Sequence, residues 1–186
     1  MQFVFDEPKA TEAASHVLSL SGGSMSYLRL IKLMYLADRR CLVETGFSIT
    51  GDRMVSMPHG PVLSAVLNRI KDAREGIATV WREAVSPPSA YQVRLLEPPP
   101  RTGRLSRYEI RVLRETCDKY KPLSDWRLRD LTHRLPEYHD PKGSMLPIDP
   151  KEILRSEGKS GKDIAWRVAL AESFVEIDHR HKQLGV

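Results

Sequence analysis

The feature that most constrains this chain is one segment, Tyr27 to Thr45, in which apolar residues fill most of the circumference that a helix would present. These residues are Leu28, Leu30, Ile31, Leu33, Met34, Tyr35, Leu36, Ala37, Cys41, Leu42 and Val43. A helix that is apolar on most sides must also be covered on most sides. The segment therefore predicts a buried helix at the centre of the fold, ended by Gly46, a residue typical of the position that follows a helix.

Shorter elements are predicted around this helix. Helical periodicity or capping residues predict helices over 9–20, from His59-Gly60-Pro61-Val62 onward with Pro61 in the first turn, over 106–120, over 124–135, over 150–156 and from Ser160. Residues 47–58 predict a short extended segment or hairpin. Alternating segments at 79–83 and 91–97, on either side of a proline turn, predict a second hairpin. The fold expected is a predominantly helical α+β fold with six to seven helices and short β-hairpins.

The length of 186 residues suits a single domain over 1–186. The segment Pro98 to Gly103 reads as a stiff linker and gives the only candidate sub-domain break, near 98–104. No apolar run approaches the roughly 18 residues of a membrane span, and residues 1–12 lack the apolar stretch of a secretory signal. Cys41 and Cys117 are expected to be reduced, buried thiols. A cytoplasmic protein without a membrane partner is expected.

Motifs that would indicate an enzyme are missing from the sequence. The six histidines form no HExxH pattern, and His179 and His181 would point about 200° apart on a helix. The two cysteines form no CxxC motif, and neither a nucleophile elbow nor a glycine-rich phosphate loop occurs. We therefore expect no catalytic residue, no metal and no cofactor. An enzyme whose site forms only in three dimensions stays an alternative.

Basic charge is concentrated in one part of the chain. The net charge is +5, and residues 101–135 hold ten Lys and Arg against five Asp and Glu. Arg107, Arg111 and Arg114 fall on one side of the helix predicted there. This side can be a solvated charged surface with an Arg111–Glu115 pair, a surface for an acidic protein, or a nucleic-acid site. Only Tyr108 supplies an aromatic ring near these arginines, which disfavours nucleic acid.

Lys32 lies inside the apolar helix, and a buried ammonium group needs a carboxylate or carbonyl partner. Asp38 is too far round the same helix, so we predict Asp52 in the following loop as that partner. Gly60 is predicted to provide either a positive φ or a close backbone approach. The roles expected for these residues are structural, with one alternative. In that alternative, four residues line one binding groove: Lys32, Tyr35, His59 and Gly60.

Several motifs have an order and spacing that resemble a known family. They are Lys32-Leu33-Met34-Tyr35-Leu36-Ala37-Asp38, then Thr45-Gly46, Ile49-Thr50-Gly51-Asp52, Gly60-Pro61-Val62, and Leu131-Thr132-His133 after Leu123-Ser124. Together they span residues 25–139 and resemble the Panacea domain, the SocA-like antitoxin family often noted as phage-associated. Two positions depart from the family pattern. His59 stands where an aromatic residue commonly precedes Gly-Pro-Val, and Tyr138 stands where a tryptophan commonly follows Leu-Thr-His.

The resemblance implies an antitoxin that neutralises a cognate toxin, encoded next to it, by direct protein–protein binding. It would either cover the working surface of the toxin or deliver the toxin to a protease, and a homo-oligomer stays open. The expected partner-binding residues are Lys32, Tyr35, His59, Gly60, Arg107, Arg111, Arg114, His133 and Tyr138. The first alternative is a nucleic-acid-binding regulator that uses the basic side of 101–135, and the second is an enzyme with a site not visible in the sequence.

Overall fold

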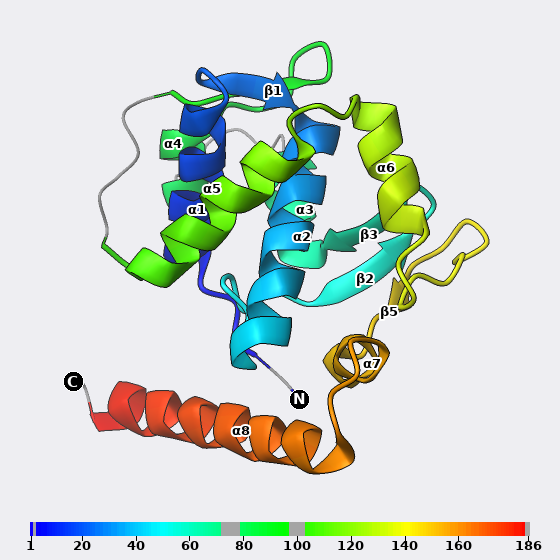
Figure 1. Cartoon of the computed structure of the whole chain (residues 1–186). Helices are drawn as coiled ribbons and strands as arrows, with labels where there is room; N and C mark the ends of the chain where they lie inside the picture. The colour runs from blue at the N-terminus through cyan, green and yellow to red at the C-terminus, as the bar shows by residue number, and fades with distance from the viewer. Residues whose placement is uncertain (2, 72–78, 97–102, 185–186) are drawn as a thin grey trace.

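The computed structural model describes residues 1, 3–71, 79–96 and 103–184, with side chains up to residue 177 (Figure 1). Within these ranges the chain forms eight helices: α1 Glu7–Leu20, α2 Tyr27–Thr45, α3 Ser64–Lys71, α4 Val80–Ala84, α5 Arg107–Tyr120, α6 Asp125–His133, α7 Pro150–Ser156 and α8 Gly161–Leu184. Five short strands accompany them: β1 Ser24–Ser26, β2 Met54–Met57, β3 Gly60–Leu63, β4 Gln92–Arg94 and β5 Leu146–Pro147. The predicted α+β class, mostly helical, is confirmed.

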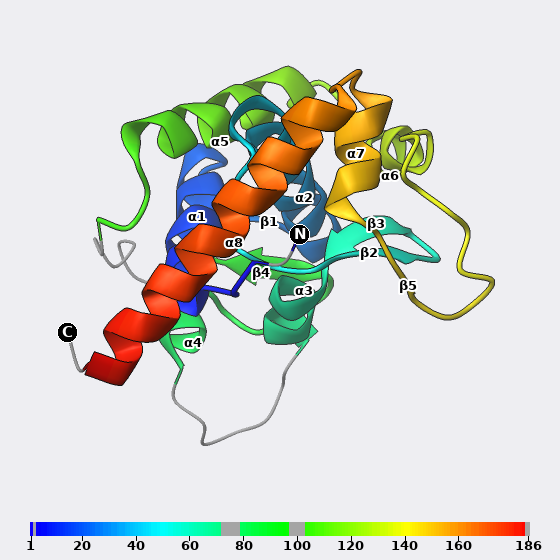
Figure 2. The same ribbon diagram turned by 90° about the horizontal axis from the view of Figure 1, so that it is seen from below.

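Helix α2 is the central buried helix that the sequence predicts, with the predicted bounds. The hydroxyl of Ser26 caps its start by accepting a hydrogen bond from the Arg29 backbone N–H at 3.1 Å. Gly46 ends it with φ +88°, donating its N–H to the Leu42 carbonyl. Every residue from 30 to 38 is buried. Helices α1, α5, α6 and α7 and strand β3 all pack against α2 (Figures 1 and 2).

The segment 60–63 corrects one prediction, because it forms strand β3 and not the start of a helix. Strand β3 pairs antiparallel with β2, and β5 pairs with the other edge of β2. The following helix, α3, begins only at Ser64. Its first N–H groups, on Ala65 and Val66, donate to the carboxylate of Asp52 at 2.9 and 2.8 Å. A cap supplied from before the hairpin therefore sets the start of α3, a contact that local sequence does not reveal.

The segment 79–83 corrects a second prediction, because most of it belongs to helix α4. The hydroxyl of Thr79 caps α4, and Trp81 and Ala84 are buried where α4 packs against α1. Tertiary burial therefore overrides the β-like composition. The other half of the expected hairpin does form a strand, β4, but it pairs with β1. The additional helix also explains why eight helices are found where six to seven were expected.

The expected linker at 98–103 lies almost wholly outside the described residues. The elements before and after it share one hydrophobic core, in which α5 packs against both α1 and α2. Helix α8 crosses the lower side of the molecule (Figure 2). Its inner side is anchored by the buried Ile164 and Ala171. Within the described part of the chain, no helix is both long and apolar enough to cross a membrane.

Candidate functional site

The loop that follows α2 is organised by the buried carboxylate of Asp38. This carboxylate accepts hydrogen bonds from the backbone N–H groups of Ile49 and Thr50, at 2.5 and 3.1 Å. The hydroxyls of Ser48 and Thr50 also donate to it, at 2.9 and 2.7 Å. Burial raises the pKa of Asp38 to about 6, although these hydrogen bonds favour the charged form. The loop is thereby fixed to α2 just before the β2–β3 hairpin begins.

Lys32 is fully buried and its ammonium nitrogen donates to the carbonyl oxygen of Pro61 at 2.8 Å. Burial, together with the nearby positive charge of Arg129, lowers the pKa of Lys32 to about 7. The prediction that Asp52 is the partner of Lys32 is wrong. The carboxylate of Asp52 is already engaged by backbone N–H groups at the start of α3, so a strand carbonyl serves Lys32 instead.

Gly60 lies where the hairpin meets both α2 and α6. Its φ is +88°, and a Cβ atom placed there would lie 2.7 Å from His133 Cδ2, 2.8 Å from Thr132 Oγ1 and 2.9 Å from Lys32 Nζ. Both the positive φ and the close approach predicted for Gly60 are confirmed. The Gly-Pro-Val and Leu-Thr-His motifs, far apart in the sequence, thus meet directly over Lys32.

His133 and Tyr138 form a stacked pair beside the hairpin. Their ring centroids are 4.6 Å apart with an interplanar angle of 24°. The backbone of His59 hydrogen-bonds the ring of His133, while the side chain of His59 is exposed at the hairpin turn. Burial lowers the pKa of His133, as do the nearby charges of Lys32 and Arg129. The ring pair is therefore expected to be uncharged at neutral pH.

Tyr35 lies beneath the surface and makes a buried polar contact. Its hydroxyl donates to Glu137 Oε1 at 2.8 Å, and Arg39 Nε donates to the same oxygen at 2.7 Å. Arg39 also pairs with Glu157 at 2.8 Å. Burial and the carboxylate of Glu137 raise the pKa of Tyr35. Lys32 and Tyr35 are both fully buried. From the protein interior, Lys32 contacts the hairpin and Tyr35 contacts the segment after α6.

The arginines of α5 form a separate surface. Arg107, Arg111 and Arg114 are exposed, and the Arg111 guanidinium lies 5.2 Å from the ring centroid of Tyr108. The expected pairing of Arg111 with Glu115 is not found, because Arg40 of α2 takes Glu115 at 2.7 Å. The structure thus divides the nine expected partner-binding residues into the α5 arginines and a cluster around the β2–β3 hairpin.

Sequence reasoning missed two residues beside that cluster. The Trp126 side chain is 60% exposed, and the Arg129 guanidinium lies over its ring, 4.9 Å from the centroid. Trp126, Arg129 and His133 lie on successive turns of α6, and Tyr138 continues the row. We call these four residues the α6 face. The helical spacing of these residues is visible in the sequence, but it does not show which side of the helix is left exposed.

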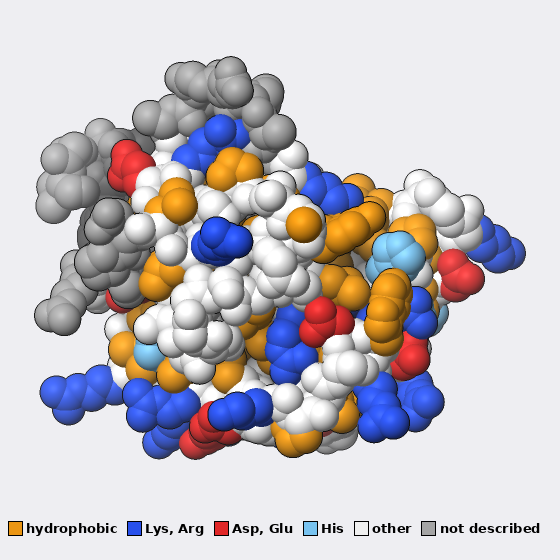
Figure 3. Space-filling view, turned by 90° about the horizontal axis from the view of Figure 1, so that it is seen from above, with side chains coloured by type: hydrophobic (Ala, Val, Ile, Leu, Met, Phe, Trp, Pro, Cys, Tyr) orange, Lys and Arg blue, Asp and Glu red, His pale blue; other side chains and the backbone are white. Residues whose placement is uncertain are grey.

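Figure 3 shows the side of the molecule that includes α6. On its right, hydrophobic side chains and a histidine lie among Lys, Arg, Asp and Glu side chains. The acidic residues of α6 already have partners. Asp125 pairs with Arg29 at 3.3 Å, and Asp130 with Arg129 at 2.5 Å. The surface around the α6 face thus combines aromatic and basic side chains with acidic ones that already have partners.

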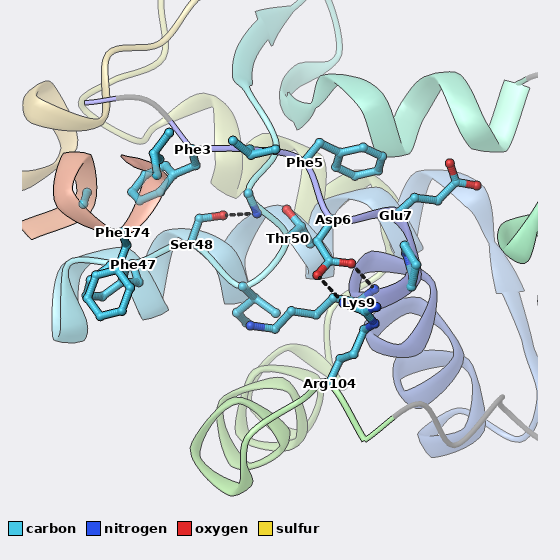
Figure 4. A pocket seen from close by; sticks show the side chains of 16 residues that line it. Phe3, Phe5, Asp6, Glu7, Lys9, Phe47, Ser48, Thr50, Arg104 and Phe174 are labelled. Atoms are coloured by element: carbon cyan, nitrogen blue, oxygen red, sulfur yellow. Dashed lines mark hydrogen bonds and ion pairs between the residues drawn. The ribbon is translucent and has the colours of Figure 1, made fainter. Parts of the chain in front are cut away.

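A groove of about 650 Å³ lies on another side, between α8, the N-terminal segment and the loop after α2 (Figure 4). Four phenylalanines contribute to it: Phe3, Phe5, Phe47 and Phe174. Its charged groups already have partners. Asp6 caps α1 and pairs with Arg104, and Lys9 pairs with Glu109 at 2.6 Å. Among the described residues, no group of three His, Cys, Asp or Glu could hold a metal ion.

Comparison with protein families gives a match that extends from residue 30, in α2, to Tyr138. The model of the family described as antitoxin SocA-like, Panacea domain, matches residues 30–138. The chain therefore belongs to this family, and the resemblance predicted from the motifs is confirmed. No curated protein and no solved structure matched the chain. The matched part contains the whole α6 face, whereas α7 and α8 lie beyond it.

Proposed function

We propose that this protein is an antitoxin that neutralises a cognate toxin by binding it directly, with the α6 face as the central contact. The observation that carries the proposal is membership of the SocA-like antitoxin family, a family whose role is expected to be non-enzymatic. The α6 face lies inside the matched region. Its residues belong to the motifs that define the family pattern or lie next to them.

The chemistry of the α6 face suits a protein partner. Tryptophan, tyrosine and arginine are the residue types that most often dominate the energy of protein interfaces. Trp126 is exposed, yet Arg129 holds its ring in place, so little side-chain freedom is lost on binding. Arg127 on α6 and Arg134 directly after it are exposed and have no ion-pair partner among the described residues. A toxin surface that combines an apolar patch with carboxylates would complement this face.

The buried residues give the α6 face a fixed support. Lys32 holds the Pro61 carbonyl, and Gly60 lets the hairpin backbone reach His133. Glu137, fixed by Tyr35 and Arg39, anchors the chain next to Tyr138. In this proposal these residues act on the toxin through the shape of the face and not by direct contact. The same face serves whether the toxin is covered in place or delivered to a protease.

Co-expression with the protein encoded next to this chain tests the proposal. That neighbour is expected to stop growth alone, and this chain to restore growth and to co-purify with it. Trp126→Ala should abolish or weaken rescue, because losing a central contact of about 2 kcal/mol raises a dissociation constant roughly 30-fold. Trp166→Ala is the matched control, because Trp166 on α8 is also 60% exposed but lies away from the α6 face.

The outcomes of this experiment separate the function from the surface. A neighbour that is harmless alone would count against the antitoxin function. Full rescue by Trp126→Ala, with loss of rescue by Trp166→Ala, would retain the function and reject the α6 face as its site. Loss of rescue by Trp126→Ala alone supports both parts of the proposal.

A second candidate function rests on α5. Its exposed arginines, Arg107, Arg111 and Arg114, suit the phosphates of a nucleic acid such as DNA upstream of the gene. Binding that falls steeply with salt and is abolished by changing the three arginines to glutamate would support such a regulator. No binding of that DNA at low salt would remove this candidate.

A further inference from the structure

Helix α8 has two apolar sides, although a surface helix needs only one. The inner side carries Ile164 and Ala171, which are 7% and 1% exposed. The outer side carries Trp166 and Ile177, which are 60% and 48% exposed, with the partly exposed Leu170 between them. Burial against this chain explains only the inner side. The outer side needs another explanation, and α8 lies outside the family-matched residues.

The outer side has the spacing of a helix–helix interface. Trp166, Leu170, Ser173 and Ile177 follow one another at intervals of four, three and four residues. This is the spacing of the positions that face a partner helix in a coiled coil. Ser173 is small and polar, and it interrupts the row of apolar residues. The outer side is therefore suited to contact with one partner helix and not to complete burial in a core.

Two charged residues beside the outer side of α8 lie at equal distances from its middle. Lys162 and Glu176 each lie seven residues from Ala169, so all three share one flank of α8. Both charged residues are exposed, and neither has an ion-pair partner within the described part of the chain. Opposite charges at equal distances from a midpoint match themselves when a second identical helix runs in the opposite direction.

We propose that the outer side of α8 binds α8 of a second copy of this chain, antiparallel and centred near Ala169. In that arrangement Lys162 of each copy meets Glu176 of the other, and the two Leu170 side chains lie together at the centre. Helix α6 is at the opposite end of the molecule from α8 (Figure 1), so the α6 face of each copy stays uncovered. This homodimer is independent of the proposed antitoxin function.

Sedimentation equilibrium of the full chain tests the proposal. The expected mass is twice the 21.2 kDa of one chain. Trp166→Ala and Leu170→Glu should each raise the dissociation constant of the dimer at least about tenfold, equivalent to about 1.4 kcal/mol. Trp126→Ala is the control and should leave the dimer unchanged. A chain that stays monomeric up to about 200 μM, or a dimer indifferent to Leu170→Glu, would overturn the proposal.

A charge exchange tests the direction of the two helices. Lys162→Glu alone and Glu176→Lys alone should each weaken the dimer, because like charges would then meet. The double variant Lys162→Glu/Glu176→Lys should restore it. A parallel pair would instead bring Lys162 beside Lys162, so that either single change would fail to weaken it. That result, or a double variant weaker than both single ones, would reject the antiparallel arrangement.

A cysteine variant gives an independent check. Ala169→Cys places a thiol near the proposed two-fold axis, while the native Cys41 and Cys117 are buried. Mild oxidation should link the two copies of this variant through the introduced thiol and leave the wild type unlinked. Cross-linking no faster than that of an exposed cysteine on α5, such as Arg114→Cys, would contradict the arrangement. Toxin binding by Trp166→Ala decides separately whether the toxin, and not a second copy, covers α8.

Discussion

Helices α2 and α8 are both long and rich in apolar residues, yet the structure uses them in opposite ways. Helix α2 is surrounded by the helices α1, α3, α5, α6 and α7 and by strands β1 and β3, and its residues 30–38 are all buried. Helix α8 rests on the rest of the molecule along one side, and Trp166 and Ile177 face outward. Apolar content alone therefore does not decide whether a helix is buried. The burial of a helix depends on how many other helices and strands pack against each of its sides.

The two helices differ also in their polar residues. Helix α2 buries Lys32 and Asp38, and each has a backbone partner from the segment that follows the helix. Among the described side chains of α8 no charged residue is fully buried, and Asp163 and Arg167 pair with each other at 3.0 Å. Polar groups on α2 therefore specify how the loop and hairpin attach. Changes on α2 should cost much more stability than changes on α8.

The largest effect is expected from Asp38→Ala. It would leave the backbone N–H groups of Ile49 and Thr50 without an acceptor in a buried position, at a cost of about 3 to 5 kcal/mol in the free energy of unfolding. Glu172→Ala on α8 is the control, and should change stability by about 0.5 kcal/mol or less. Urea unfolding measures both. Similar losses for the two variants would break the contrast between the helices.

Gly60→Ala should have the next largest effect, about 2 to 4 kcal/mol, because it combines an unfavourable φ with contacts under 3 Å. Gly158→Ala is matched for φ, which is +76°, but has open space around it. It should cost only about 1 kcal/mol. Urea unfolding of both variants isolates the close approach of the hairpin to α2 and α6. Equal losses would show that the approach itself contributes nothing.

Lys32 should give an effect that depends on pH. Because its pKa is lowered to about 7 in the folded state, the unfolded chain binds more protons between pH 7 and its ordinary pKa near 10.4. Its contribution therefore makes stability rise with pH over that window, by at most about 1.4 kcal/mol per pH unit. Lys32→Met should remove this part of the slope, whereas Lys121→Met, at an exposed lysine, should not. An unchanged slope in Lys32→Met would contradict the lowered pKa.

Asp38 should have the opposite dependence at lower pH. Its folded pKa of about 6 lies above the ordinary value of 3.8, so the folded chain binds more protons between these values. Stability from this group therefore falls as pH rises from about 4 to 6. Asp38→Asn should flatten that part of the profile, measured by thermal unfolding from pH 4 to 7. A profile that keeps its slope would show that Asp38 is not the group responsible.

The sequence was most informative where local rules decide the structure. The bounds of α2, the helix at 106–120 that corresponds to α5, and the special backbone of Gly60 were all predicted. It was least informative where a distant group decides. The late start of α3 depends on Asp52 from before the hairpin, and burial against α1 turns 80–84 into a helix.

For the candidate site, too, the sequence predicted what local motifs determine and missed what distant groups determine. The motifs identified Lys32, Gly60 and His133, but not the carbonyl that Lys32 binds, because backbone acceptors leave no signal in the sequence. Trp126 was missed for a different reason. Helical periodicity shows which residues share a side, and not which side the rest of the chain covers.

The affinity of the purified chain for its proposed toxin, the protein encoded next to it, tests the central claim. This claim is that α2 supports an α6 face that binds the toxin. Isothermal titration calorimetry on the wild type, Trp126→Ala and Trp166→Ala gives three dissociation constants. We expect a rise of about 30-fold or more for Trp126→Ala and a change under about twofold for Trp166→Ala. Unchanged affinity in Trp126→Ala, or a larger loss in Trp166→Ala, would contradict the account.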